Sequence, residues 1–107
     1  MATKGYVVMR YSSPRGPVGR YDDWYASLLA VAEEEWPKTK AAGASAWRAL
    51  RDMLGNSPRN MLQIEFSSVD CAMQWLISPE RKVFVERLLD IGTLDFDINV
   101  YRLHSEG

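Results

Sequence analysis

The chain has 107 residues with 13 basic and 14 acidic side chains, so its formal net charge is −1. This length suffices for one domain, spanning residues 1–107, and is too short for two ordinary ones. The balanced charge argues against nucleic-acid binding, which usually needs a basic excess on one face. No stretch reaches the roughly 20 apolar residues that span a bilayer, and no signal-peptide pattern begins the chain, so we expect a cytoplasmic protein without a membrane partner.

The first 40 residues predict a strand, a loop and a long helix. Residues 5–11 (GYVVMRY) are aromatic and β-branched, and the turn formers SSPRGPVG follow them. Residues 20–38 place apolar side chains at helical spacing. Pro37 is expected to end this helix, because the residue before a proline resists the α conformation. The acidic run at 33–35 (EEE) is expected to be a solvated helix face.

The stretch AWRALRDML, residues 46–54, is ambiguous. Its alanine, leucine, arginine and methionine residues are good helix formers, so the local pattern favours a helix. As a strand, it would place Trp47, Ala49, Arg51 and Met53 on one face. The interpretation of this stretch decides the fold, because a strand here gives the element order βαββαβ.

The second half of the chain predicts a strand and two helical segments. Residues 55–60 (GNSPRN) form a turn, and residues 61–66 (MLQIEF) alternate apolar and polar side chains as a strand does. Ser67 and Asp70 have capping-box spacing and begin a helix. Ser78 and Pro79 restart the helix, and Gly92 ends it.

Residues 94–103 (LDFDINVYRL) predict the last strand. Phe96, Ile98 and Val100 would share one face. The other face would carry Asp95, Asp97, Asn99 and Tyr101.

The middle of the chain resembles a known group of proteins. In AWRALRDMLGNSPRNMLQIEFSSVDCAMQWL, Arg48 and Arg51 lie three apart before a glycine turn, then a strand ends in Glu-Phe-Ser-Ser, and a helix follows. This pattern resembles small dimeric α+β-barrel proteins, which include antibiotic-biosynthesis-monooxygenase-like and NIPSNAP-like domains. The resemblance implies that 46–54 is a strand. It also implies a ferredoxin-like fold, with a four-stranded antiparallel sheet, helices on one face and a homodimer that closes a barrel.

The resemblance implies a pocket for a small apolar or aromatic molecule. Related proteins include cofactor-independent monooxygenases, isomerases and cyclases, and such a protein would need no cofactor. The alternative is a non-catalytic dimeric ligand-binding or accessory protein. Haem-degrading members need a histidine well inside the fold, whereas His104 follows the last predicted strand.

Two sets of residues are candidates for a site. Glu65, Asp97 and Tyr101 could act as acids or bases if partly buried. The candidates for contact with a substrate are Trp24, Trp47, Arg51, Trp75 and Asn99. We expect Arg48 or Arg51 to pair with Glu65 across neighbouring strands. A single cysteine and a single histidine do not make a metal site, so no metal is expected.

Overall fold

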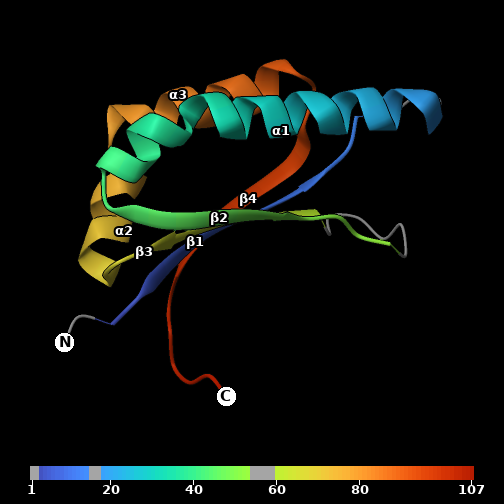
Figure 1. The fold of residues 1–107 in the computed structure, drawn as a ribbon. Coiled ribbons are helices and arrows are strands. Elements are labelled where there is room, and N and C mark those ends of the chain that lie inside the picture. The colour runs from blue at the N-terminus through green and yellow to red at the C-terminus, as the bar shows by residue number, and fades with distance from the viewer. Residues whose placement is uncertain (1–2, 15–17, 54–59) are drawn as a thin grey trace.

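Four antiparallel strands and three helices make up the computed structural model, which describes residues 3–14, 18–53 and 60–107. The strands are β1 (Gly5–Ser12), β2 (Ala44–Leu50), β3 (Asn60–Phe66) and β4 (Leu94–Arg102). The helices are α1 (Val18–Ala41), α2 (Val69–Leu76) and α3 (Pro79–Asp90). The sheet order is β2-β3-β1-β4, which is the ferredoxin-like arrangement with its second helix broken into α2 and α3 (Figure 1).

The ambiguous stretch is a strand from its start to Leu50. Trp47 pairs with Ile64 and Ala49 with Leu62 in the β2–β3 register, so both side chains lie on the face that the helices cover. Packing on this face outweighs the local helix propensity. Residues 51–53 continue beyond the strand. Of the expected turn at 55–60, residues 55–59 lie outside the described residues and Asn60 begins β3.

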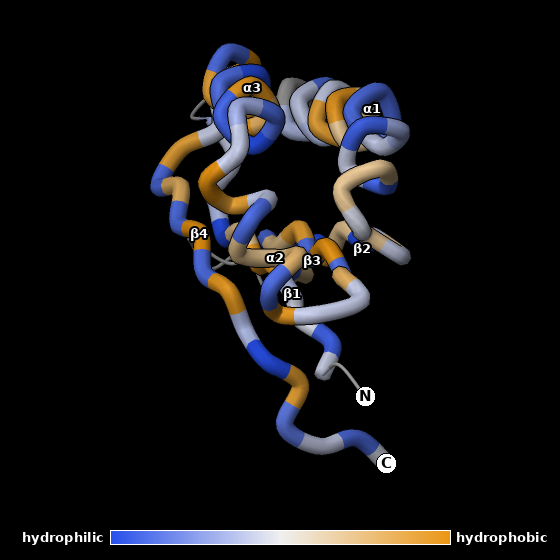
Figure 2. The backbone as a smooth tube through the Cα atoms, turned by 90° about the vertical axis from the view of Figure 1, so that its left-hand side faces the viewer, coloured by the Kyte–Doolittle hydropathy of each residue, from blue (hydrophilic) through white to orange (hydrophobic). Residues whose placement is uncertain are grey.

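All three helices lie on the same side of the sheet, and the other face is uncovered (Figures 1 and 2). The strands contribute fully buried side chains to the helix side, and each helix packs at least one large side chain against them. The largest of these core residues are Met9, Tyr11, Leu28, Leu62, Ile64, Phe66, Trp75 and Leu88. The core therefore lies between the sheet and the helices.

Helix α1 does not stop at Pro37, so that prediction is wrong. The helix continues to Ala41 with Pro37 on its exposed side. Its last turns are held by packing, because Thr39 is buried and Trp36 packs against the core. The acidic run is not wholly solvated either. Glu35 is only 6% exposed and accepts a hydrogen bond of 3.5 Å from Arg87 on α3.

The caps of α2 and α3 follow the sequence closely. Ser78 caps α3 as predicted, since its Oγ accepts a hydrogen bond from the backbone N–H of Arg81. Gly92 has the positive φ, 97°, that suits a chain leaving a helix. The cap of α2 is Ser68, one residue later than the predicted Ser67, and it accepts from the N–H of Cys71.

Strand β4 contains an irregularity at its start. Asp95 has a φ of 51°, and the β1–β4 register shifts opposite residues 10–12. One extra residue on β4 fits a bulge, which breaks the alternation at this point. Asp95 and Asp97 therefore do not form the regular same-face pair that their spacing predicts.

Candidate functional site

The sheet divides the predicted site residues into two sets. One set lies on the uncovered face of the sheet, hereafter the open face. This set is Glu65, Asp97, Asn99 and Tyr101. The other set lies on the helix side and comprises Trp24, Trp47, Arg51 and Trp75. A ligand between helices and sheet cannot touch the first set, so of the predicted binding residues only Asn99 lies with the predicted acid–base residues.

Glu65 is the most tightly held carboxylate of the open face. Its side chain accepts hydrogen bonds from the hydroxyls of Ser45 at 2.6 Å and Tyr6 at 3.1 Å, and Lys4 lies 3.6 Å away. The Ser45 hydrogen bond, helped by Tyr6 and Lys4, lowers the pKa of Glu65 against the opposing effect of burial. A carboxylate stabilised in its charged form is a weak general base.

The expected pairing of Glu65 with an arginine is wrong. In the described part of the chain its ion-pair partner is Lys4, and neither Arg48 nor Arg51 reaches it. Arg51 extends to the helix side, where its Nη2 lies 3.0 Å from Oδ1 of Asp22. Arg48 of β2 therefore lies on the open face, and Arg51, just beyond the strand, lies on the helix side.

The remaining candidates on the open face are surface groups in the single chain. Arg10 donates a hydrogen bond of 3.1 Å to the Tyr101 hydroxyl and stacks over its ring at 5.8 Å. Asn99 donates to Asp97 at 3.3 Å. Asp97, Asn99 and Tyr101 are exposed, so they form no enclosed site within one chain.

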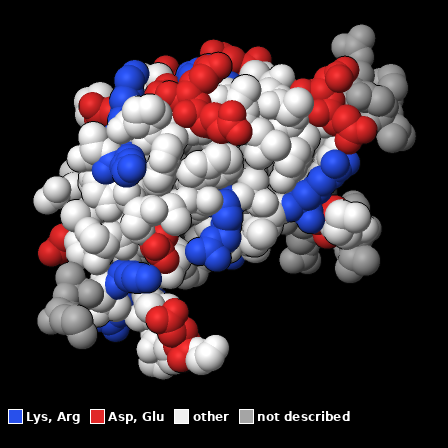
Figure 3. Space-filling view, in the orientation of Figure 1, with Lys and Arg blue, Asp and Glu red and all other residues white. Residues whose placement is uncertain are grey.

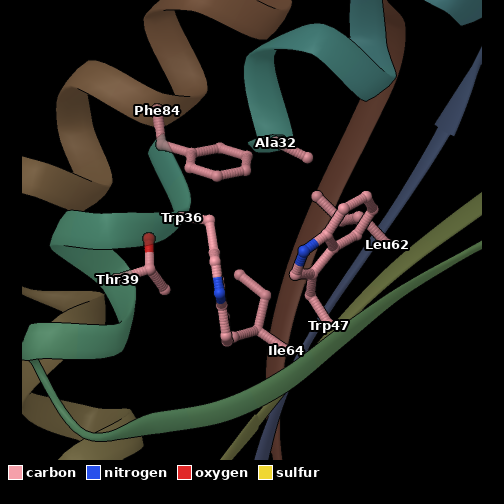
Figure 4. A pocket seen from close by; sticks show the side chains of 7 residues that line it. All are labelled: Ala32, Trp36, Thr39, Trp47, Leu62, Ile64 and Phe84. Carbon is pink, nitrogen blue, oxygen red and sulfur yellow. The ribbon is translucent and has the colours of Figure 1, made fainter. Parts of the chain in front are cut away.

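An apolar hollow lies between α1, α3 and the sheet (Figure 4). It holds about 190 Å³, including the part that opens to solvent. Its lining consists of Ala32, Trp36, Thr39, Trp47, Leu62, Ile64 and Phe84. The Thr39 hydroxyl donates to the backbone carbonyl of Glu35 at 2.9 Å, so it is already satisfied within α1. None of these lining side chains is an acid or a base, so the hollow is built for apolar contact.

The hollow opens between two tryptophans. Trp36 of α1 and Trp47 of β2 are partly exposed, whereas the other five lining residues are buried. Figure 4 shows both indoles at the edge of the space, on either side of Ile64. Trp47 is a predicted substrate contact, and Trp36 is one of the further aromatics of the first helix that the sequence offers as lining for a pocket. The spacing along α1 marks Trp36 as part of the apolar stripe, but its position opposite Trp47 depends on how α1 docks on β2.

The other two candidate tryptophans belong to the core. Trp24 is 4% exposed, and its indole N–H donates to the Thr93 hydroxyl at 3.1 Å. Trp75 is 2% exposed and packs on the rings of Phe66 and Phe84. Neither lines the hollow. Both positions are therefore explained by packing between helix and sheet.

Comparison with known proteins finds the fold and little sequence likeness. No protein-family model matches the chain, and no curated protein matches its sequence. A solved structure from Caulobacter crescentus, named as a candidate antibiotic biosynthesis monooxygenase, has a TM-score of 0.66 at 12% identity, covering 97% of this chain and 92% of that one. SnoaB from Streptomyces nogalater, a cofactor-independent oxygenase solved as a mutant, has a TM-score of 0.62 at 12% identity, covering 98% and 97%.

A third solved structure is a dimeric ferredoxin-fold protein of unknown function from Bacteroides fragilis. Its TM-score is 0.63 at 16% identity, covering 94% of this chain and 96% of that one. This chain has the fold of the antibiotic-biosynthesis-monooxygenase-like, ferredoxin-fold proteins. The resemblance inferred from residues 46–76 is thus confirmed for the fold. At these identities the likeness says nothing about a shared reaction.

Potential metal ligands are scattered over the described residues. Within them, no three or more His, Cys, Asp or Glu side chains gather closely enough to hold a metal ion. His104 is exposed beyond β4, outside the helix–sheet layer. None of the helices described has the length and apolar character needed to cross a membrane.

Proposed function

We propose that the protein binds an apolar or aromatic small molecule in the hollow between α1, α3 and the sheet. The observation that carries this proposal is the opening of an apolar hollow between Trp36 and Trp47. Ligand sites are typically concave and apolar, and indole rings bind planar molecules well. The space of about 190 Å³ includes its open mouth and its interior is narrow, so an aromatic ligand enters by turning the Trp36 and Trp47 indoles outward.

We propose further that any reaction there is of the cofactor-independent kind. The residues that line the hollow offer neither an acid nor a base, so the protein would act by positioning a reactive substrate and excluding water. SnoaB, described as a cofactor-independent oxygenase, shares the fold over 98% of this chain. Support for oxygenation rests on that likeness, and support for binding rests on the hollow.

The assembly that we propose is a homodimer formed through the open face. This face mixes polar groups with Leu50, which is 45% exposed, and Tyr101, which is 42% exposed. An antiparallel sheet with helices on one side must leave its other face wet or cover it. A second copy could cover it across a twofold axis, and the Bacteroides fragilis protein of this fold is described as dimeric.

Two alanine-to-leucine substitutions on α1, one inside the hollow and one outside it, test the binding site. Ala32 is buried and lines the hollow, whereas Ala26 is exposed on the same helix. Ala32→Leu should fill the hollow and abolish saturable quenching of tryptophan emission by N-(p-tolyl)-2-naphthylamine. Ala26→Leu should leave that titration unchanged. Equal binding by both variants would show that the ligand sits elsewhere.

Whether a bound compound is chemically converted distinguishes an oxygenase from a non-catalytic ligand-binding protein. Aromatic phenols and naphthols that bind in an Ala32-dependent manner would be incubated with the protein in air and recovered for mass spectrometry. A product that has gained one oxygen atom and lost two hydrogen atoms, with the second atom of O2 released as water, would support the oxygenase if wild type forms it and Ala32→Leu does not. Quantitative recovery of every bound compound would support a ligand-binding or accessory protein.

A further inference from the structure

We infer that the ligand of this site is an elongated aromatic molecule with an anionic group, and that Arg51 binds the anion. This inference rests on the proposed function and adds the chemical class of the ligand. It starts from the contact between α1 and β2, hereafter the α1–β2 seam. The seam is formed by Tyr21, Tyr25, Leu29 and Trp36 of α1, by Trp47 and Ala49 of β2, and by Arg51 just beyond β2.

Between the hollow and the guanidinium of Arg51, the seam consists of aromatic and aliphatic side chains that pack against the core. Trp36 and Trp47 face each other at one end, and the guanidinium of Arg51 lies 4.3 Å from the ring centroid of Tyr21 at the other. Arg51 also lies 5.3 Å from the ring centroid of Tyr25, one turn further along α1. Because α1 and β2 meet at both the Trp36–Trp47 end and the Arg51 end, they run side by side along the seam.

The seam residues of α1 are more exposed than the α1 residues that point into the core. Tyr21, Tyr25 and Leu29 are partly buried, while Leu28 and Val31 on the neighbouring side of α1 are buried. A planar molecule with its rings in the hollow could therefore extend along the seam over apolar side chains. Its far end would reach the guanidinium of Arg51.

Arg51 is held in a position that suits an anion. Its guanidinium stacks over Tyr21 and lies 5.3 Å from the ring centroid of Tyr25, which fixes its plane. A planar guanidinium binds a carboxylate or sulfonate through two parallel hydrogen bonds. The side chain remains 43% exposed, so a ligand can approach it.

The present partner of Arg51 is easily replaced. Asp22 accepts its hydrogen bond at 3.0 Å, but the Asp22 side chain is 70% exposed. Ion pairs at such exposure contribute little free energy, because water screens the charges. A ligand anion that also buries rings along the seam would therefore compete well with Asp22.

Charges of both signs surround the seam. Figure 3 shows carboxylates gathered along the helical layer and basic side chains both beside the helices and at the level of the strands. Arg48, the other arginine of the pair three residues apart, lies on the open face, opposite Gln63 in the register. Arg48 thus offers a control that removes the same charge three residues away, on the other side of the sheet.

A matched pair of fluorescent probes tests the inference. 2-(p-Toluidino)naphthalene-6-sulfonate carries an anion at the far end of its ring system, and N-(p-tolyl)-2-naphthylamine is the same molecule without the sulfonate. Arg51→Gln should weaken binding of the sulfonate about tenfold, as expected for the loss of one charge-assisted contact. Asp22→Asn should strengthen it about twofold by removing the competitor. Neither change should alter binding of the neutral probe, and Arg48→Gln should alter neither probe.

The outcomes separate this inference from the proposed function. If Ala32→Leu leaves both probes bound as in wild type, the proposed site is wrong. If both probes depend on Ala32 but Arg51→Gln weakens them equally or not at all, the hollow is a ligand site and the anion is not held by Arg51. The inference is supported if Arg51→Gln weakens binding of the sulfonate probe alone and Asp22→Asn strengthens it. Stronger binding by Asp22→Asn cannot be explained by loss of folding.

Discussion

Ser45 on β2 donates a hydrogen bond of 2.6 Å from its hydroxyl to the Glu65 carboxylate on β3. Tyr6 on β1 donates to the same carboxylate from the other side. Three neighbouring strands are thus joined on the open face by one acidic side chain. The network stabilises the charged form of Glu65, so it connects the stability of the sheet to pH.

Glu65 should give the protein a stability that is lost in acid. The folded-state pKa of Glu65 lies below the ordinary value of 4.5 that applies to the unfolded chain, so the carboxylate favours folding above that pH. Its contribution falls as the pH drops below about 4.5 through the lower folded-state pKa. Urea denaturation of wild type and Glu65→Gln from pH 7 to pH 3 should show their difference in unfolding free energy shrinking in acid. Glu33→Gln, on the exposed side of α1, serves as the control, and a difference independent of pH for Glu65→Gln would contradict the prediction.

A charge placed on the open face should dissociate the proposed dimer. Leu50 is 45% exposed in the single chain, so Leu50→Asp costs the monomer little, but it would bury an unpaired carboxylate between two sheets. Ile77, which is 80% exposed after α2, provides the control variant Ile77→Asp. Light scattering after size-exclusion chromatography should show a dimer for wild type and Ile77→Asp and a monomer for Leu50→Asp. A Leu50→Asp dimer would place the subunit contact elsewhere.

Two buried hydroxyls should respond in opposite ways to removal. The Thr93 hydroxyl accepts a hydrogen bond from the indole N–H of buried Trp24, so Thr93→Val should lower the unfolding free energy by about 1–3 kcal/mol.

The Tyr11 hydroxyl is buried without a hydrogen-bond partner among the described residues, and burial raises its pKa. Tyr11→Phe should therefore raise the unfolding free energy by about 1 kcal/mol. Urea denaturation monitored by circular dichroism measures both, and a loss of stability in Tyr11→Phe would show that a buried water satisfies the hydroxyl.

Pro37 should weaken the helix that contains it. It lies four residues before the end of α1, lacks the N–H that would bond to residue 33, and is exposed. Pro37→Ala should raise the unfolding free energy by about 1–2 kcal/mol, less than the full penalty for a central proline because packing of Trp36 and Thr39 already holds this turn. Ala30→Pro, at an exposed site in the middle of α1, should cost about 3 kcal/mol or more and mark the upper end of the scale. An unchanged or lower stability of Pro37→Ala would contradict the expectation.

Local patterns in the sequence predicted the elements that alternate or cap cleanly. Strand β3 and most of β4 follow from period-two alternation, and Ser78 and Gly92 mark the ends of α3. Strand β2 was predicted only through resemblance, because its residues favour a helix locally and become a strand by burying Trp47 and Ala49. The prediction that the first helix ends at Pro37 is wrong, because the packing of neighbouring residues outweighs the local effect of the proline.

The candidate site could be predicted only in part. The alternation of β3 and β4 placed Glu65 and Asp97 on one face, but the register across the β2–β3 connection decides which side of β2 joins that face. That register is a tertiary property, so Arg51 was expected near Glu65 and lies instead beside Asp22. The position of Trp36 opposite Trp47 likewise depends on helix docking, which spacing within one element does not encode.

All four tryptophans lie on the helix side of the sheet: Trp24 and Trp36 on α1, Trp47 on β2 and Trp75 on α2. The open face, where we place the subunit contact, carries tyrosine but no tryptophan among the described residues. Intrinsic tryptophan emission is therefore an optical reporter of one side of the molecule alone. Dilution that dissociates the proposed dimer should leave the emission spectrum unchanged, whereas ligand binding in the hollow should change it. One fluorescence measurement therefore distinguishes ligand binding from dimer dissociation.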